Sequence, residues 1–193
     1  MSAPAVPTRL AHRPTVGGLV VPWVSLESDR GHHLGQVSEG RRVAALRGRL
    51  CQICGEALYL DRYVLLGRAS DEARGYVVEP GMHPECAAYS VKACPMLTGA
   101  MDHYRKHPVD MSGRSCPDPD CGCSFLPSPD STVRAGRPAD TFFKVLAATT
   151  TDYRLALTQD GIALAWPQQP LRVRTVATGA LRAALDLITQ KEN

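Results

Sequence analysis

The sequence predicts an α+β fold, and three observations support this class. Short segments rich in strand-forming residues follow one another in the C-terminal part, at 142–148, 153–158, 162–166 and 171–176. A helix is expected from Pro84 to Cys94, because proline suits the first helical position and Pro95 prevents the helix from continuing. Cysteine pairs at short spacing precede this helix and begin it, which indicates a metal-stabilised core.

Length and composition bound the kind of protein. The 193 residues suffice for one full domain, or for one domain with a small satellite. The formal net charge of +3 creates no strong field toward DNA or a membrane. No run of about 18 apolar residues is present to span a bilayer, and Met1–Val20 lacks the pattern of a secretory signal. We therefore expect a cytoplasmic protein without structural disulfides, in which seven cysteines and few aromatic residues favour bound metal.

Composition divides the chain into four parts. The expected parts are a flexible, Pro- and Ala-rich arm at 1–17, a metal-binding domain at 18–107, a Pro- and Cys-rich loop at 108–140, and a β-sheet with one packed helix at 141–193. Seven arginines against three acidic residues give the first 50 residues a charge of +4. The two ends of the chain therefore carry the basic excess.

Local patterns predict the elements around the cysteines and at the C-terminus. The expected elements are an edge strand at Gly18–Leu26 that contains Pro22, one or two helical turns at Arg41–Leu50, a hairpin or bent strand at Ala57–Leu66, a short strand at 76–78, and a second helix at about Met96–His107. Asp160-Gly161 supplies a hairpin turn between two C-terminal strands. Residues 179–190 place Leu181, Leu185 and Ile188 at helical spacing.

The first cysteine group is Cys51-Gln-Ile-Cys54 with His83-Pro-Glu-Cys86. Zinc takes four nitrogen or sulfur ligands in a tetrahedron. The two-residue gap lets one tight turn present both Cys51 and Cys54, and Gly55 allows a turn conformation closed to other residues. His83 and Cys86 stand three apart at a helix start, so they share a face. We predict these four residues as zinc ligands in a treble-clef-like order of knuckle, hairpin and helix; the alternative is unrelated thiols and a surface histidine.

Cys94 competes with Cys86 for the fourth ligand position. On one continuous helix the two residues would be about 12 Å apart along the axis. One ion cannot bind both, so Cys94 is predicted to be a small buried side chain.

A second cysteine group falls in the Pro-rich loop. Cys116, Cys121 and Cys123 with His107 would make another Cys₃His zinc site, and His103 could replace His107. Such a metal would hold a loop that lacks a core. The alternatives are a mobile loop with free thiols or a redox pair of Cys121 and Cys123.

Catalysis has little support in the sequence. A catalytic zinc keeps one position for water, whereas four protein ligands can close both predicted sites. A nuclease of the HNH class, which uses a treble clef, needs a histidine after the hairpin, and residues 58–81 contain none. Motifs for a P-loop, a dinucleotide site or a nucleophile elbow are missing. No catalytic residue is therefore predicted.

Basic residues mark candidate contact surfaces. The candidates for contact with phosphate or with a partner are Arg41, Arg42, Arg47 and Arg49, for which a solvated surface is an equally good interpretation. Arg172 and Arg174 share one face of a strand, and for them we favour the solvated surface. Aromatic residues for stacking on single strands are scarce. Sequence-specific DNA recognition by this chain alone is not expected.

The residues around the cysteines resemble a known family. Leu50–Glu56 (LCQICGE) and Met82–Leu97 (MHPECAAYSVKACPML) resemble small zinc-finger proteins of actinobacterial phages and prophages. In that family a strand with a VPW-like motif, here Val21-Pro22-Trp23, precedes the knuckle, and a β-rich tail ending in a helix follows. The resemblance implies the same four zinc ligands and no catalytic residue. The group Cys116–Cys123 lies outside the family pattern.

The opening and the cysteine-rich loop are also similar to recombination directionality factors of temperate Streptomyces phages. Those factors bind a large serine integrase and switch it from integration to excision by protein contact. The resemblance implies a non-enzymatic phage accessory protein in the bacterial host cytoplasm, with an integrase on DNA as partner, weak or indirect DNA contact and no small-molecule substrate. The alternatives are a zinc-finger regulator that binds DNA or RNA and, with less support, a metal-dependent nuclease.

Overall fold

The computed structural model describes residues 4–107, 133–159 and 161–176. Within these ranges helices combine with small antiparallel sheets, which confirms a mixed α and β protein. The N-terminal elements are η1 (Thr8–Leu10), β1 (Thr15–Val16), β2 (Leu19–Val20), β3 (Ser25–Ser28), β4 (Gly31–Val37) and α1 (Glu39–Gly48). β1 pairs with β2, and β3 pairs with β4. The strand expected at 18–26 is interrupted between β2 and β3, where Pro22 has no N–H to donate.

The N-terminal arm differs from the prediction. Residues 4–17 were expected to be flexible, but Leu10 is fully buried. The Arg9 guanidinium also donates hydrogen bonds to the Glu85 carboxylate at 2.8 Å and to the Tyr59 hydroxyl at 2.9 Å. One apolar and one charged side chain therefore fix a segment whose Pro- and Ala-rich composition indicated disorder.

Helix α1 is longer than the one or two turns expected. The Ser38 hydroxyl caps its start by accepting a hydrogen bond from the Arg41 backbone N–H at 3.4 Å. At the other end Arg49 takes a left-handed φ of 52°, which stops the helix just before Cys51. Ala45 and Leu46 are fully buried, so packing stabilises this arginine-rich helix.

The middle of the chain contains β5 (Tyr63–Arg68), α2 (Ala69–Arg74), β6 (Tyr76–Val77), α3 (Pro84–Ala93) and α4 (Pro95–Thr98). α3 ends before Pro95, as predicted. The helix expected at 96–107 is wrong beyond Thr98, because Gly99 takes a φ of 76° and ends α4. In the described part of the chain no helix has the length and apolar character needed to cross a bilayer.

The expected C-terminal strands are confirmed. They are β7 (Phe142–Ala147), β8 (Leu155–Thr158), β9 (Gly161–Ala165) and β10 (Arg172–Val176), with α6 (Thr149–Asp152) before β8. β8 and β9 form the expected hairpin, and Gly161 has a φ of 103° where β9 begins. The packed helix expected at 179–190 lies outside the described residues.

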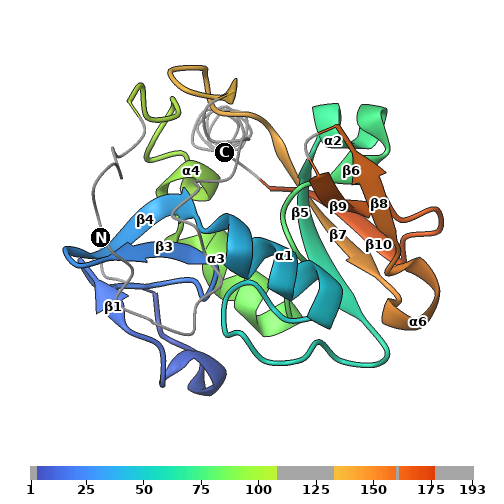
Figure 1. Ribbon diagram of the computed structural model, residues 1–193, viewed down its shortest axis with the longest axis horizontal. Helices are drawn as coiled ribbons and strands as arrows, with labels where there is room; N and C mark the ends of the chain where they lie inside the picture. The colour runs from blue at the N-terminus through green and yellow to red at the C-terminus, as the bar shows by residue number, and fades with distance from the viewer. Residues whose placement is uncertain (1–3, 108–132, 160, 177–193) are drawn as a thin grey trace, which may run out of the picture.

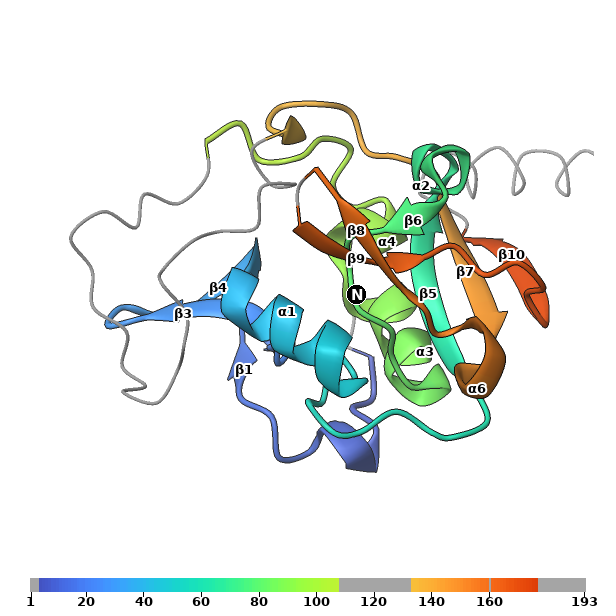
Figure 2. The same cartoon turned by 45° about the vertical axis from the view of Figure 1, so that its right-hand side comes forward.

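The C-terminal strands share their sheets with earlier parts of the chain. β7 lies between β5 and β10, and β9 lies between β6 and β8. Figures 1 and 2 show these strands gathered on one side of the molecule, with the β3–β4 hairpin on the other side and α1 between them. The expected boundary between 18–107 and 141–193 therefore runs through both three-stranded sheets.

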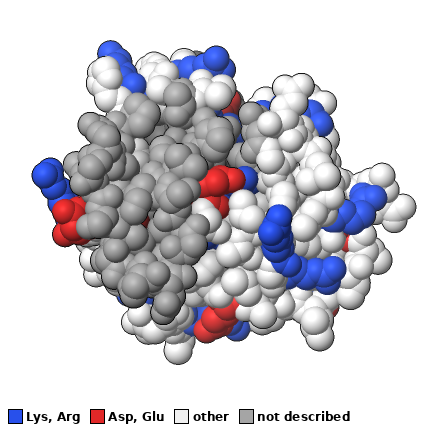
Figure 3. Space-filling model, viewed as in Figure 1, with Lys and Arg blue, Asp and Glu red and all other residues white. Residues whose placement is uncertain are grey.

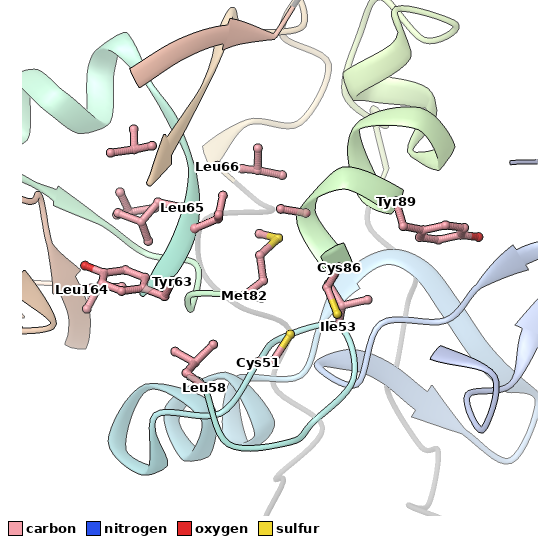
Figure 4. Packing of buried hydrophobic residues seen from close by; sticks show 14 of the residues in the cluster. Cys51, Ile53, Leu58, Tyr63, Leu65, Leu66, Met82, Cys86, Tyr89 and Leu164 are labelled. Carbon is pink, nitrogen blue, oxygen red and sulfur yellow. The ribbon is translucent and has the colours of Figure 1, made fainter. Parts of the chain in front are cut away.

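A continuous core joins these sheets to the cysteine-rich region. Met82 and Val64 of β5 exchange two backbone hydrogen bonds, at 2.8 and 2.9 Å. Figure 4 shows the Met82 side chain between the side chains of β5 and the sulfur atoms of Cys51 and Cys86. Folding of the β5 sheet and assembly of the site are therefore coupled.

Candidate metal centre

Four side chains from two distant segments meet in the interior. The ligand-type atoms of Cys51, Cys54, His83 and Cys86 all lie within 4.8 Å of one another, and all four residues are buried. Figure 4 shows the sulfur atoms of Cys51, on a loop, and of Cys86, at the start of α3, close to each other. These are the four residues that the spacing predicted, and they lie close enough to bind one metal ion.

A tight turn presents the first pair. The Gly55 N–H donates to the Cys51 carbonyl at 2.8 Å, and the Cys51 N–H donates to the Glu56 carbonyl at 2.8 Å. Gly55 has a φ of 83°, the freedom for which the sequence suggested glycine. A Cβ at Gly55 would also lie 2.6 Å from the Trp23 ring. The glycine is therefore required both by the turn and by the close approach of Trp23.

The Val21-Pro22-Trp23 segment supports this turn through its backbone. The Trp23 N–H donates to the Ile53 carbonyl at 3.0 Å, and the Val24 N–H donates to the Gln52 carbonyl at 3.2 Å. Sequence reasoning gave Trp23 no part in the site. A tryptophan in a chain with few aromatic residues was a hint that Trp23 matters. Local sequence patterns, however, do not reveal that Trp23 contacts the knuckle.

The start of α3 presents the second pair. His83 is the N-cap residue, Pro84 begins the helix, and Cys86 lies in the first turn. The positive end of the helix dipole favours a thiolate at Cys86. Pro84 fits here because the first helical residues have no intrahelical acceptor for their N–H groups.

The backbone around the knuckle orients the His83 ring. His83 Nε2 lies 2.9 Å from the Ala57 carbonyl oxygen, and Nδ1 lies 3.4 Å from Cys54 Sγ. A carbonyl oxygen accepts and cannot donate, so Nε2 carries the proton and Nδ1 is the nitrogen available to a metal. The ring also packs on Tyr59, with 4.5 Å between ring centroids.

Hydrogen bonds among the sulfur atoms affect the thiols of Cys51 and Cys86 in opposite directions. Burial raises the pKa of the Cys51 thiol, but hydrogen bonds from Cys54 and Cys86 and from backbone N–H groups outweigh burial and lower this pKa. The pKa of Cys86 is raised, because its thiol donates hydrogen bonds to Cys51 and Cys54. A bound divalent cation would favour the thiolate form of the cysteine ligands.

A polar network from the N-terminal arm covers the outer side of the cluster. Besides its bonds to Glu85 and Tyr59, Arg9 pairs with Glu56, which follows the knuckle. The Tyr59 hydroxyl donates to the Glu85 carboxylate at 2.5 Å. Since Glu85 lies between the ligand-type residues His83 and Cys86, Arg9 links both halves of the site. Sequence analysis missed this network because the arm was expected to be flexible.

Cys94 lies outside the four-residue cluster. It occupies the junction of α3 and α4, packs against the core and lines a cavity of about 290 Å³ together with Met82 and Leu97. Burial raises the pKa of its thiol. Cys94 is therefore a partly buried side chain that packs against the core, rather than the fully buried one that was predicted.

The predicted second zinc site stays a prediction. Cys116, Cys121 and Cys123 lie outside the described residues. His103 and His107 are described and exposed. His103 Nδ1 lies 3.0 Å from the Asp102 carboxylate.

Two of the four predicted contact arginines are engaged within the protein. Arg41 Nη2 donates to the Glu27 carboxylate at 3.0 Å, and the side chain also reaches two backbone carbonyls. Arg42 is 2% exposed and binds Glu39 and the carbonyls of Val78 and Ile162. The prediction of a partner contact is wrong for Arg42, because the fold itself satisfies this guanidinium.

The other two arginines remain available on the surface. Arg47 and Arg49 are exposed, and the Arg49 guanidinium lies 5.5 Å from the centroid of the Tyr153 ring. On the face shown in Figure 3, Lys and Arg lie in several separate clusters. A surface role for Arg47 and Arg49 therefore stays a prediction.

Comparison with known proteins gives no counterpart: no family model matches the chain, and no curated protein or solved structure is significantly similar to it.

Proposed function

We propose that this protein is a zinc-stabilised binding protein without enzymatic activity. The observation that carries the proposal is the closed set of four buried ligand-type side chains, Cys51, Cys54, His83 and Cys86. Four protein ligands fill the tetrahedron of zinc and leave no position for water or substrate. In this proposal the metal stabilises the fold and takes no part in a reaction.

The donor set and the order of elements support zinc in a treble-clef-like core. Three sulfurs and one imidazole nitrogen are ligands that zinc favours. A bridge between Leu50 and Ala57 closes the knuckle, and a bridge between Val64 and Met82 brings β5 beside the residues that lead into α3. Knuckle, β-pairing and helix follow one another as they do in a treble clef.

The most specific form of the proposal is a recombination directionality factor that switches a large serine integrase to excision. Its support is the resemblance of the knuckle, the His83–Cys86 segment and the Val21-Pro22-Trp23 motif to phage proteins. The contact between Trp23 and Gly55 gives that motif a physical role in the fold. Such a protein would act in the cytoplasm of the bacterial host on an integrase bound to DNA.

A pull-down with purified integrase, followed by a recombination assay on excision-type sites, tests this form of the proposal. We expect a complex and stimulated excision by the metal-loaded protein. If no complex forms and excision is not stimulated, the directionality role is refuted. The metal site would still be judged by its own measurements.

A nucleic-acid-binding regulator is the second candidate, and the exposure of Arg47 and Arg49 favours it. Gel shifts with the chain alone separate the two candidates. The primary proposal predicts weak, salt-sensitive and sequence-independent shifts, whereas tight, sequence-specific binding to naked DNA or RNA would support the regulator. Divalent-metal-dependent cleavage of DNA that one histidine substitution abolishes would instead contradict the non-enzymatic assignment.

A further inference from the structure

β10 is an open edge of its sheet. The order β10-β7-β5 gives β10 a single strand neighbour among the described residues, and Figure 2 shows it at the outer side of β7. The residues Arg172–Thr175 are all exposed. Such an edge presents a row of N–H and C=O groups that can pair with another strand.

One face of this edge carries like charges without acidic partners. Arg174 lies directly opposite Lys144 of β7, and Arg172 is two positions away on the same face. Like charges placed opposite each other destabilise a sheet. The positions on this face of the three strands include no acidic residue: Val64, Leu66, Arg68, Phe142, Lys144, Leu146, Arg172, Arg174 and Val176.

Arg68 differs from these three basic residues in having an acidic partner. Arg68 is on the same face and forms an ion pair with Asp71 at 2.7 Å. No ion pair is present for Lys144, Arg172 or Arg174 within the described ranges. The fold therefore supplies an acidic partner for the buried Arg68, whereas Lys144 of the central strand and the two arginines of the edge strand have none among the described residues.

The other side of β10 carries the exposed side chains of Val173 and Thr175, and Leu171 just before the strand is exposed as well. Leu171 is 61% exposed and Val173 is 48% exposed. From Leu171 to Arg174 the chain thus alternates apolar and basic side chains with period two. Phosphate groups of a nucleic acid would satisfy the arginines but leave Leu171 and Val173 without a contact.

We propose that β10 accepts an extended segment of a partner protein as an added strand, in which acidic and apolar residues alternate. Same-face side chains of a strand recur at every second residue, so the acidic ones would lie opposite Arg172 and Arg174. The apolar ones would pack on Leu171 and Val173, and backbone hydrogen bonds along the edge would supply affinity. A second copy of this chain is a poor occupant, because it would bring further arginines to the same edge. The inference rests on the proposed function as a partner-binding protein and names the surface that it uses.

A fluorescently labelled peptide of alternating Glu and Val tests the inference by anisotropy titration of the full-length, zinc-loaded protein. The wild type is expected to bind this peptide and not the corresponding Lys-Val peptide. The double variant R172E/R174E is expected to bind the Glu-Val peptide about tenfold or more weakly and to gain binding of the Lys-Val peptide. Circular dichroism and zinc content establish that the variant is folded.

A matched control uses another exposed edge strand. Leu157 lies on β8, an edge strand without charged residues, and is 88% exposed. Leu157→Glu is expected to leave binding of the Glu-Val peptide unchanged. In two further peptides the backbone nitrogens of either all Glu or all Val residues are N-methylated. Alternate N–H groups of an added strand point toward β10, so one of these two peptides must lose binding.

Three results would overturn the inference. They are equal binding of Glu-Val peptide by wild type and R172E/R174E, retained binding by both N-methylated peptides, or no binding at about 1 mM peptide. If duplex DNA binds through Arg172 and Arg174 and the peptide does not bind, the surface is a phosphate site. If the protein binds the integrase but not the peptide, the proposed role of β10 is refuted and the directionality role stands. If it binds the peptide but not the integrase, only the directionality role is refuted.

Discussion

The Gly55 position tests how closely Trp23 and the knuckle depend on each other. Gly55→Ala places a side chain at a φ of 83° and brings its Cβ to 2.6 Å from the Trp23 ring. We predict a loss of about 2–4 kcal/mol in the free energy of unfolding, from backbone strain and overpacking together. Urea unfolding of the zinc-loaded protein measures this loss.

Gly75→Ala is the matched control for backbone strain. Gly75 has a φ of 79°, and a Cβ there would meet nothing within 4 Å. We expect a loss of about 1–2 kcal/mol, from the left-handed conformation alone. Equal losses in the two variants would show that the Trp23 contact contributes nothing.

The ligand assignment is tested by comparing two cysteines. Cys54→Ser removes a predicted zinc ligand and is expected to lower zinc content and the melting temperature by roughly 10 °C or more. Cys94→Ala removes a side chain at the α3–α4 junction and should cost about 1 kcal/mol with zinc retained. Elemental analysis and thermal melts provide both readouts. Full zinc occupancy in Cys54→Ser would refute the ligand set.

At the residue scale, the sequence predicted the metal ligands, whose spacing is short, and missed contacts between residues that are far apart in the chain. Two ligand pairs at fixed short spacing are recognisable because zinc geometry demands them. The bond between Arg9 and Glu85 joins residues 76 positions apart, and no local pattern encodes it. The burial of Arg42 was missed for the same reason, since its acceptors Val78 and Ile162 lie far along the chain.

At the element scale, Arg42 connects α1 to the residue that follows β6 and to β9. We predict that Arg42→Met lowers the free energy of unfolding by about 3 kcal/mol, because the Glu39 carboxylate and two carbonyls lose their shared partner. Chemical denaturation measures the change. Arg47→Met on the same helix is the control and should stay within about 0.5 kcal/mol, since Arg47 is exposed. Similar effects from both substitutions would contradict the structural role of Arg42.

Proline and glycine explain which element boundaries were predictable. Pro84 and Pro95 delimit α3 because of covalent geometry that does not depend on the rest of the fold. The expected helix at 96–107 was taken to run on to the boundary at Pro108, but Gly99 in a left-handed conformation ends α4 after Thr98. Glycine permits that conformation without demanding it, so the tertiary fold decided the boundary.

At the scale of the whole molecule, the pairing of β7 with β5 predicts that the metal-binding part does not fold alone. A fragment of residues 1–107 lacks the strands that cover β5 and β6. We expect it to show little stable tertiary structure even with zinc, and to gain structure when a fragment of residues 133–193 is added. NMR spectra of each fragment and of their mixture measure this. A cooperative, well-dispersed spectrum from 1–107 alone would contradict the shared-sheet architecture.

The sheets join segments that the predicted division into domains had separated, because sheet pairing is not a local property. The strands at 142–176 were recognised from their own residues, yet their neighbours β5 and β6 lie earlier in the chain. Backbone hydrogen bonds carry no side-chain signature of their partner, and the Pro- and Cys-rich composition of 108–140 suggested a linker between separate units. The strands were therefore predictable, whereas the sheets were not.

The central claim is that a closed Cys₃His zinc site stabilises a binding protein. Zinc K-edge X-ray absorption on the protein with Cys116, Cys121 and Cys123 changed to Ser tests this most directly, because the first site is then isolated. The predicted result is one zinc per chain with three sulfur neighbours at about 2.3 Å and one nitrogen at about 2.0–2.1 Å. An oxygen neighbour from water, fewer than three sulfurs, or no bound zinc would contradict the claim.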